Sequence, residues 1–135
     1  MKTYSYLVLL LVFICMGCSS DKKSTDCSEA ICTDVYISIP VTVIYEDGSI
    51  VKLDSYEVKE VETGKVRDVW GTIKGYDAYT IASDLDREDF YNKKVKLQLV
   101  GKIAGEIVVQ EEYTVTADCC HVCLLEGNKT VTIKR

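Results

Sequence analysis

Alternation of apolar and polar residues over 35–45 constrains the fold of this chain more than any other feature. The odd-numbered residues are all apolar and the even-numbered residues are mostly polar, so a strand here would bury one row of side chains and expose the other. The apolar row consists of Val35, Ile37, Ile39, Val41, Val43 and Tyr45. We therefore predict a long strand with one buried face. Pro40, on the opposite row, indicates either a sheet edge or a β-bulge.

Short apolar runs separated by turns continue to the end of the chain. Asp47-Gly48 is typical of a hairpin turn, and Glu62-Thr63-Gly64-Lys65 predicts the next turn. Residues 83–90 are the one helix-like stretch, a turn or two capped by Ser83. Further strands are predicted at 50–53, 56–61, 66–73, 76–81, 95–99 and 107–117, and a final hairpin at 121–125 and 130–134. About seven short strands predict an all-β antiparallel β-sandwich, with a small barrel as the alternative.

The N-terminal segment has the layout of a secretory signal. Lys2 precedes an apolar run over 7–14, and Gly17 places a small residue directly before Cys18. A cysteine at that point resembles a bacterial lipoprotein signal, in which the thiol of the first mature residue is acylated. The apolar run is shorter than the ~20 residues that a membrane-spanning helix needs. We therefore predict a signal peptide at 1–17 and lipidation of Cys18.

Beyond the signal, the chain divides into a polar tether at 18–33 and a β-sandwich domain at 34–135. The net charge of the whole chain is −5, and loss of Lys2 with the signal makes the mature chain more acidic. Such a chain is not suited to bind nucleic acid or anionic lipid by charge. Its membrane contact would come through the N-terminal lipid. The expected location is the cell envelope, anchored to the outer membrane and available for display at the cell surface.

Three stretches of the chain together resemble a known group of proteins. They are 41–48, 62–65 and 113–122, and the most specific part is Asp118-Cys119-Cys120-His121. Over residues 32–134 the chain resembles small Bacteroidetes lipoproteins with a carboxypeptidase regulatory-like domain, which has a transthyretin-like (prealbumin-like) β-sandwich. The resemblance implies this fold and a location in the cell envelope. The group has no established enzymatic activity, so the resemblance does not predict an enzyme. Cys27 and Cys123 depart from the pattern expected of the group.

Five cysteines remain for other uses once Cys18 is acylated. They are Cys27, Cys32, Cys119, Cys120 and Cys123. In an exported protein their default use is disulfide bonding, but the sequence leaves the pairing open. We favour bridges from the start of the domain to its end, with Cys32 joined to Cys119 or Cys120 and Cys27 to another of the three. Closing a loop of nearly 90 residues would stabilise the domain by about 4 kcal/mol in the chain-entropy model.

The same cysteines also support two hypotheses that assign them a chemical function, metal binding or redox cycling. A zinc site could use Cys119, Cys120, His121 and Cys123, with Cys27 and Cys32 as the second pair. Alternatively, the C-x-x-C formed by Cys120 and Cys123 could cycle between dithiol and disulfide if its surroundings lowered one thiol pKa. Oxidation outside the cytoplasm competes with metal binding, and no βαβ pattern surrounds the motif. We therefore predict no metal and no cofactor, and keep a thiol-based metal or redox protein as the alternative function.

Other candidate residues have simpler interpretations. His121, the sole histidine, is read as a surface or turn residue, because a strand sends neighbouring side chains to opposite faces. The acidic residues of 84–89 lack the spacing of a calcium loop and indicate a solvated turn. Three aromatic residues could line a binding face for sugar or peptide, but aromatic residues in strands more often pack in a core: Trp70, Tyr76 and Tyr79.

The sequence contains no Gly-rich phosphate loop, no H-E-x-x-H and no G-x-S-x-G. We therefore predict a non-enzymatic protein that serves as a binding or adhesion module, or as an accessory to larger envelope proteins. Its partner would be a protein or glycan whose identity the sequence does not indicate. A protease inhibitor is a third class for a small disulfide-tied domain, although no segment has the features of an inhibitory loop.

Overall fold

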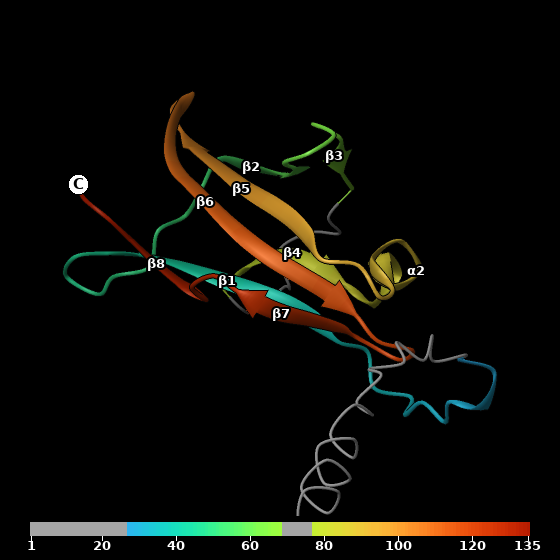
Figure 1. The fold of residues 1–135 in the computed structure, drawn as a ribbon. Helices are drawn as coiled ribbons and strands as arrows, with labels where there is room; N and C mark the ends of the chain where they lie inside the picture. Colours follow the sequence, from blue (N-terminus) through green and yellow to red (C-terminus); the bar gives the residue numbers. More distant parts are fainter. Residues whose placement is uncertain (1–26, 69–76) are drawn as a thin grey trace, which may run out of the picture.

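Eight strands form a two-layered β-sandwich in the parts of the chain that the computed structural model describes, residues 27–68 and 77–135 (Figure 1). The three-stranded sheet has the order β4 (Tyr79–Ser83), β1 (Ser38–Tyr45), β8 (Thr130–Ile133). The five-stranded sheet has the order β3 (Val66–Arg67), β2 (Ser55–Glu60), β5 (Val95–Ile103), β6 (Glu106–Ala117), β7 (Val122–Glu126). The predicted all-β sandwich is confirmed.

The pairing of β8 differs from the prediction. Residues 121–125 and 130–134 were expected to form a hairpin, but β7 pairs with β6 in one sheet and β8 pairs with β1 in the other. The chain changes sheets around Gly127, whose φ of +120° is open to glycine and strained for other residues. β8 runs parallel to β1, from Thr42 opposite Thr130 to Tyr45 opposite Ile133, whereas the other strand pairs are antiparallel.

The core lies between the two sheets. The odd-numbered residues of β1 from Ile39 to Val43 are buried, as the alternation predicts. They pack with a cluster from the facing sheet that includes Val58, Leu97, Leu99, Tyr113 and Val115. Burial of each such side chain is worth about 1.5–3 kcal/mol relative to exposure, so this cluster dominates the stability of the domain. Phe90 belongs to the same cluster.

The pairing of β1 explains the places of Pro40 and Val35 in the structure. The register of β1 against β4 shifts between Ile39 and Pro40, so Pro40 marks a bulge; it does not mark an edge, because β1 is the central strand of its sheet. Val35 was expected to be buried but is 59% exposed. The reason is that pairing with β4 begins at Ser38, so the preceding residues lie outside the sheet.

The predicted turns and helical stretch are largely present. Asp47-Gly48 lies in a turn closed by the Tyr45 amide, which donates to the Ser49 carbonyl at 2.8 Å, but 50–53 forms only an isolated bridge. Residues 84–90 form the 3-10 turn η3 (Asp84–Asp86) and the short helix α2 (Arg87–Phe90). The Asp86 carboxylate accepts the Ser83 amide at 2.9 Å. Of the strand predicted at 66–73, β3 covers Val66–Arg67, and 69–73 lies outside the described residues.

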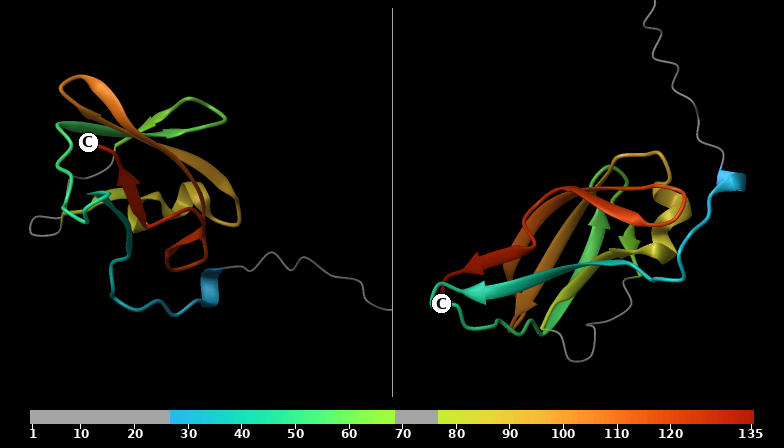
Figure 2. Two further views of the ribbon diagram at one scale, coloured as in Figure 1. Left: turned by 90° about the vertical axis from the view of Figure 1, so that its left-hand side faces the viewer. Right: turned by 90° about the horizontal axis from the view of Figure 1, so that it is seen from below.

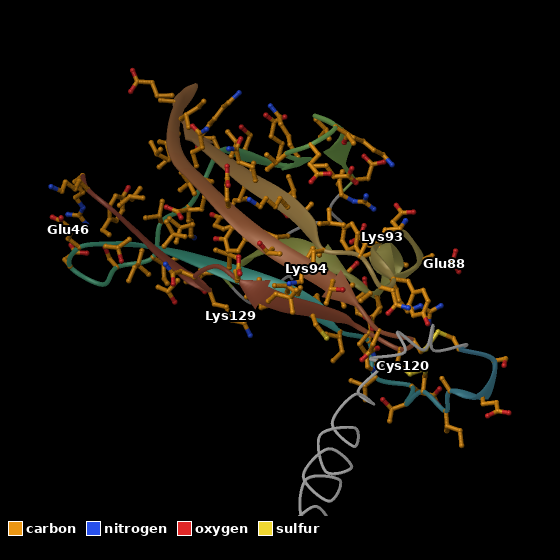
Figure 3. The ribbon with its side chains drawn as sticks, viewed as in Figure 1. Glu46, Glu88, Lys93, Lys94, Cys120 and Lys129 are labelled. Atoms are coloured by element: carbon orange, nitrogen blue, oxygen red, sulfur yellow. A yellow bond between two sulfur atoms is a disulfide. The ribbon has the colours of Figure 1, made fainter. Side chains whose placement is uncertain are left out.

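The elongated domain has two distinct ends. Residues 27–29, which form the 3-10 turn η2 (Cys27–Glu29), lie with α2 at one end, and the C terminus lies at the other (Figure 2). Side-chain positions give the same picture, with Cys120 at the first end and Glu46 at the second (Figure 3). Over the described residues, no helix has the length and apolarity needed to cross a membrane.

Candidate functional site

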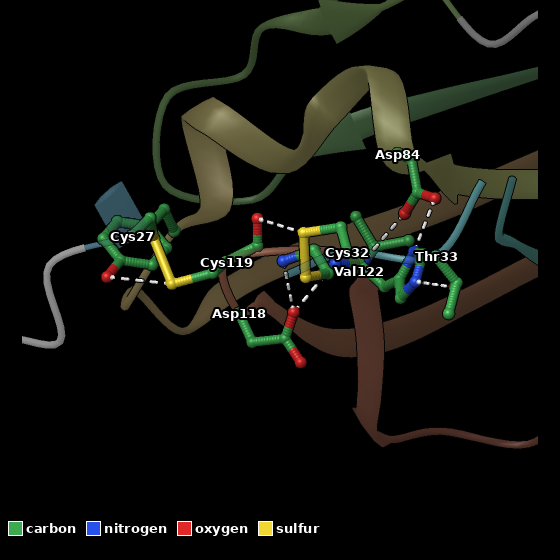
Figure 4. Close-up of a disulfide and its surroundings, with 10 residues drawn as sticks. Cys27, Cys32, Thr33, Asp84, Asp118, Cys119 and Val122 are labelled. Carbon is green, nitrogen blue, oxygen red and sulfur yellow. Dashed lines mark hydrogen bonds and ion pairs between the residues drawn. A yellow bond between two sulfur atoms is a disulfide. The ribbon is translucent and has the colours of Figure 1, made fainter. Parts of the chain in front are cut away.

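Two disulfides join the start of the described chain to the turn between β6 and β7. Cys27 is bonded to Cys119 and Cys32 to Cys120, with a Cα–Cα distance of 5.3 Å in each pair (Figure 4). We call these two bonds the cysteine clasp. The clasp uses four of the five candidate cysteines and runs from the start of the domain to its end. It attaches 27–33, which the sequence analysis assigned to the tether, to the body of the sandwich.

The turn that carries Cys119 and Cys120 is organised by Asp118. Its carboxylate accepts the backbone amides of Cys120 at 2.7 Å and His121 at 2.8 Å, and its own amide donates to the His121 carbonyl at 3.0 Å. These amide donors hold the pKa of Asp118 below its usual value, because they stabilise the charged form. The turn therefore places two consecutive cysteines where both can reach the 27–32 segment.

Asp84 is the polar centre beside the clasp. Its carboxylate accepts the Ile37 amide at 2.8 Å, the Val122 amide at 3.0 Å and the His121 ring nitrogen Nδ1 at 2.9 Å (Figure 4). Burial favours the neutral acid, but these hydrogen bonds outweigh it and lower the pKa of Asp84. One side chain thus joins three segments far apart in sequence: the approach to β1, the η3 turn and the start of β7.

His121 was predicted to be a surface or turn residue, and its side chain has two specific neighbours. Its ring lies between Asp84 and Thr33, with Nε2 3.5 Å from the Thr33 hydroxyl oxygen. Asp118, three positions earlier in the sequence, contacts the His121 backbone, whereas the His121 ring contacts Asp84. The carboxylate, imidazole and hydroxyl follow one another in the order of a hydrolase triad, although the hydroxyl lies somewhat farther from the ring than the typical distance of about 2.6–3.2 Å. The evident effect of these contacts is to cross-link the clasp end.

Cys123 is the one free cysteine among the described residues, and its side chain is exposed on β7. It does not pair with Cys120, so the C-x-x-C is not closed into a disulfide in this structure. The four sulfur atoms of the clasp are in disulfide bonds, so they cannot act as thiolate ligands to a metal in this form. Within residues 27–68 and 77–135, no group of three or more His, Cys, Asp or Glu side chains is placed to hold a metal ion.

The acidic residues of 84–89 are engaged in contacts that the sequence analysis did not anticipate. Arg67 on β3, 8% exposed, pairs with Asp86 at 2.7 Å, Asp89 at 2.8 Å and Glu60 at the end of β2. Its guanidinium carbon also lies 4.7 Å from the centre of the Phe90 ring. Burial opposes the charge, yet the three carboxylates raise the pKa of Arg67 further above its ordinary range. The predicted solvated turn is therefore partly a buried ionic cluster.

A hollow of about 370 Å³ opens beside this cluster, between the β2–β3 turn and the start of β5. Its walls combine carboxylates and ammonium groups; they are formed by Glu60, Glu62, Thr63, Asp89, Phe90, Lys93, Lys94, Val95 and Lys96. Glu60 and Asp89 are already committed to Arg67, and the Lys93 ammonium donates to the Asp89 carbonyl at 3.3 Å. The hollow is a polar depression whose lining carries three carboxylates and three ammonium groups.

The favoured interpretation of the strand aromatic residues, that they pack in the core, is confirmed for Tyr79. Tyr79 is buried, donates its hydroxyl to the Val51 carbonyl at 3.1 Å and accepts the Leu53 amide at 2.7 Å. Its ring packs edge-on against Tyr56 with centroids 5.1 Å apart. Tyr79 is therefore a core residue. Trp70 and Tyr76 lie outside the described residues.

Two roles were not predicted from the sequence. They are Asp84 as a hydrogen-bond acceptor that joins three segments, and Arg67 as the positive charge that pairs with the acidic turn. A signal for Arg67 exists: a run of four acids within 84–89 needs a cation once any of them is buried. For Asp84 the sequence holds no such signal, because its three donors come from residues 37, 121 and 122. Their proximity depends on the pairing of the two sheets and on the clasp.

Comparisons of the chain with known family models, with curated proteins and with solved structures find no match.

Proposed function

We propose that this chain is a lipid-anchored protein of the cell envelope whose sandwich serves as a non-enzymatic binding, adhesion or accessory module. The observation that carries the proposal is the cysteine clasp, Cys27–Cys119 and Cys32–Cys120. Stable structural disulfides are typical of proteins that fold in an oxidising compartment. The N-terminal signal and Cys18 also predict export. Two independent features of the chain therefore support the same cellular location.

The position of the clasp supports anchoring in particular. Cys27 is the ninth residue after Cys18, and it is bonded directly to the domain. A fully extended stretch of that length spans at most about 30 Å. An acyl group on Cys18 would therefore hold one end of the sandwich near the membrane. The opposite end, with the 46–49 turn and the β5–β6 hairpin, would face away from it and be available to a protein or glycan partner.

Metabolic labelling with an alkynyl fatty acid, followed by membrane fractionation, tests the proposal. The native chain is expected to take up label and to remain with the outer membrane through a high-salt wash. Cys18→Ser removes the acylated thiol and should lose both label and membrane association, whereas Cys123→Ser should keep both. A native chain that is exported without label, or a Cys18→Ser chain that stays membrane-bound, would contradict the anchor.

The binding role is tested separately by surface cross-linking. Cells expressing the anchored chain are treated with a membrane-impermeant cross-linker, and adducts are compared with those of a variant altered at the far end, Asp47→Lys/Arg135→Glu. These exposed residues pair at 3.1 Å, so the exchange keeps two opposite charges in contact and reverses their positions; circular dichroism checks that the fold is kept, because Asp47 also accepts the Ser49 amide. Loss of a discrete adduct in the variant supports a partner at this end. Absence of any discrete adduct in the native chain would contradict the module's proposed role.

A further inference from the structure

Nine large apolar side chains are exposed among the described residues, and the four most exposed belong to segments at the clasp end. Four of them form what we call the apolar rim: Ile31, Val35, Tyr36 and Leu85. Their exposed fractions are 98%, 59%, 59% and 66%, and no other large hydrophobic side chain among the described residues exceeds the 56% of Ile107. Single exposed apolar residues are ordinary, but several strongly exposed ones on joined segments indicate an interaction surface.

The rim residues come from two segments that the structure joins firmly. Ile31 precedes Cys32, which is bonded to Cys120. Tyr36 precedes Ile37, whose amide donates to the Asp84 carboxylate at 2.8 Å and whose carbonyl accepts the Asp84 amide at 3.0 Å. Leu85 directly follows Asp84. The rim therefore lies on a braced part of the molecule, and no element within residues 27–68 and 77–135 covers its apolar groups.

The length of chain outside the described residues indicates what covers the rim. Cys18 lies nine positions before Cys27, so an acyl chain on Cys18 cannot lie more than about 30 Å from the clasp. A lipid surface is then the nearest apolar environment at this end of the domain. Apolar side chains partition some 5–10 Å into the boundary between headgroups and acyl chains, and tyrosine suits that boundary because its ring is apolar and its hydroxyl polar.

We propose that the clasp end rests on the lipid surface, with the apolar rim in contact with the headgroup region. The inference rests on the proposed anchor at Cys18 and adds an orientation to it. The anchor alone would leave the domain free to rotate on its tether. Contact through the rim would keep the long axis of the sandwich pointing away from the membrane surface. The 46–49 turn and the C terminus, which lie at the opposite end of the domain, would then face outward (Figures 1 and 3).

Fluorescence quenching by brominated lipid tests the orientation in the full acylated chain. Trp70, the only tryptophan, is replaced by Phe, and one new tryptophan is introduced at a time: Tyr36→Trp or Leu85→Trp at the rim, and Ile107→Trp as the control. Ile107 is exposed to nearly the same extent as Tyr36, and it lies beside the β5–β6 hairpin at the far end. Each chain is reconstituted into vesicles of phosphatidylcholine brominated in the upper acyl chain.

The proposal predicts that both rim probes are quenched about two-fold or more relative to unbrominated vesicles, while the Ile107→Trp probe is unchanged. Equal, weak quenching of all three probes in acylated, vesicle-bound protein would overturn the orientation and leave the anchor intact. A chain that carries no acyl group and does not float with vesicles would overturn the anchor and the orientation together. Tryptophan emission from the rim probes could instead depend on protein concentration and not on brominated lipid. That result would indicate a second copy of the chain at this surface, and it would also overturn the proposal.

Discussion

The Asp84 carboxylate and the His121 imidazole lie 2.9 Å apart, Oδ2 to Nδ1, although 37 positions separate the two residues in sequence. Asp84 also accepts the amides of Ile37 and Val122, so it satisfies donors at the entrance to β1 and at the start of β7. Loss of one partner would leave buried polar groups unpaired, which costs more than the hydrogen bond itself contributes. The clasp end therefore depends on this carboxylate as well as on its disulfides.

Replacement of Asp84 should destabilise the domain substantially. Asp84→Ala removes the acceptor of two backbone amides and one imidazole and is expected to lower the free energy of unfolding by about 2–4 kcal/mol. Glu88→Ala, on the neighbouring helix at a side chain 91% exposed, is the matched control and should change it by less than about 0.5 kcal/mol. Urea unfolding followed by circular dichroism measures both. Equal stabilities of the two variants would contradict the role of Asp84.

The domain should lose stability on acidification through its low-pKa carboxyl groups. Asp84 and Asp118 both have pKa values held below the ordinary 3.8 by hydrogen bonds to their charged forms. Their contribution is therefore fully present above about pH 4 and is lost as the pH falls through the lower folded-state values. Asp84→Asn should show a smaller drop in unfolding midpoint between pH 6 and pH 3 than the native chain. A drop as large as that of the native chain would indicate that other groups control acid unfolding.

The two disulfides should act non-additively. With one in place, the other closes only a short additional loop, so loss of either pair, by Cys27→Ser/Cys119→Ser or Cys32→Ser/Cys120→Ser, should cost about 2 kcal/mol. Loss of both reopens loops with sequence separations of 88 and 92 residues. In the chain-entropy model this costs about 7 kcal/mol, which is comparable with the whole stability of many domains. Thermal unfolding of the three variants measures the effect; additive losses would show that the bonds act independently.

Gly127 should be the least replaceable glycine at a turn. Its φ is +120°, and a Cβ there would overlap Cδ1 of the buried Tyr113 ring. Gly127→Ala combines backbone strain with overpacking and is expected to cost about 2–4 kcal/mol. Gly64→Asn is the control, because its φ of +70° suits Asn and a Cβ at that position would meet no heavy atom within 4 Å. The same stability for both variants would show that Tyr113 moves aside without cost.

Arg67 should not be replaceable by lysine. The guanidinium contacts Glu60, Asp86 and Asp89 together and stacks on Phe90, a geometry that an ammonium group does not reproduce. Arg67→Lys is expected to cost about 1–2 kcal/mol and Arg67→Met about 3 kcal/mol, since the latter leaves three carboxylates without a counter-charge. Because Asp89 is held at a low pKa by Arg67, the Met variant should recover part of its loss near pH 4. No recovery at that pH would contradict the electrostatic explanation.

The sequence predicts the strands well wherever one face is buried by a paired neighbour. Ile39, Val41 and Val43 are buried as their alternation indicates. The same rule fails for Val35, which precedes the first paired residue of β1, and for Ile107, which is 56% exposed. Near Ile107 the register of β5 and β6 shifts between Gly101 and Lys102, so one extra residue on β6 reverses the face that the pattern assigns.

Long-range features were harder to predict than local ones. The turn at Asp47-Gly48 and the cap at Ser83 depend on a few neighbouring residues, and both are present. The parallel pairing of β8 with β1 depends on where the chain changes sheets, and a local pattern at 126–128 is equally typical of a hairpin. Cysteine counting limited the disulfides to a set of possibilities, but the choice of Cys119 for Cys27 depends on the Asp118 turn.

Modification of Cys18 is the central feature of the proposed anchor, and intact-mass analysis of the protein from its own membrane fraction tests it directly. We predict a chain that begins at Cys18 and carries the mass of at least two acyl chains, with two disulfides and one thiol, Cys123, open to alkylation without reduction. A mass that retains residues 1–17, or a chain cleaved at another residue without acyl groups, would contradict the anchored-module account.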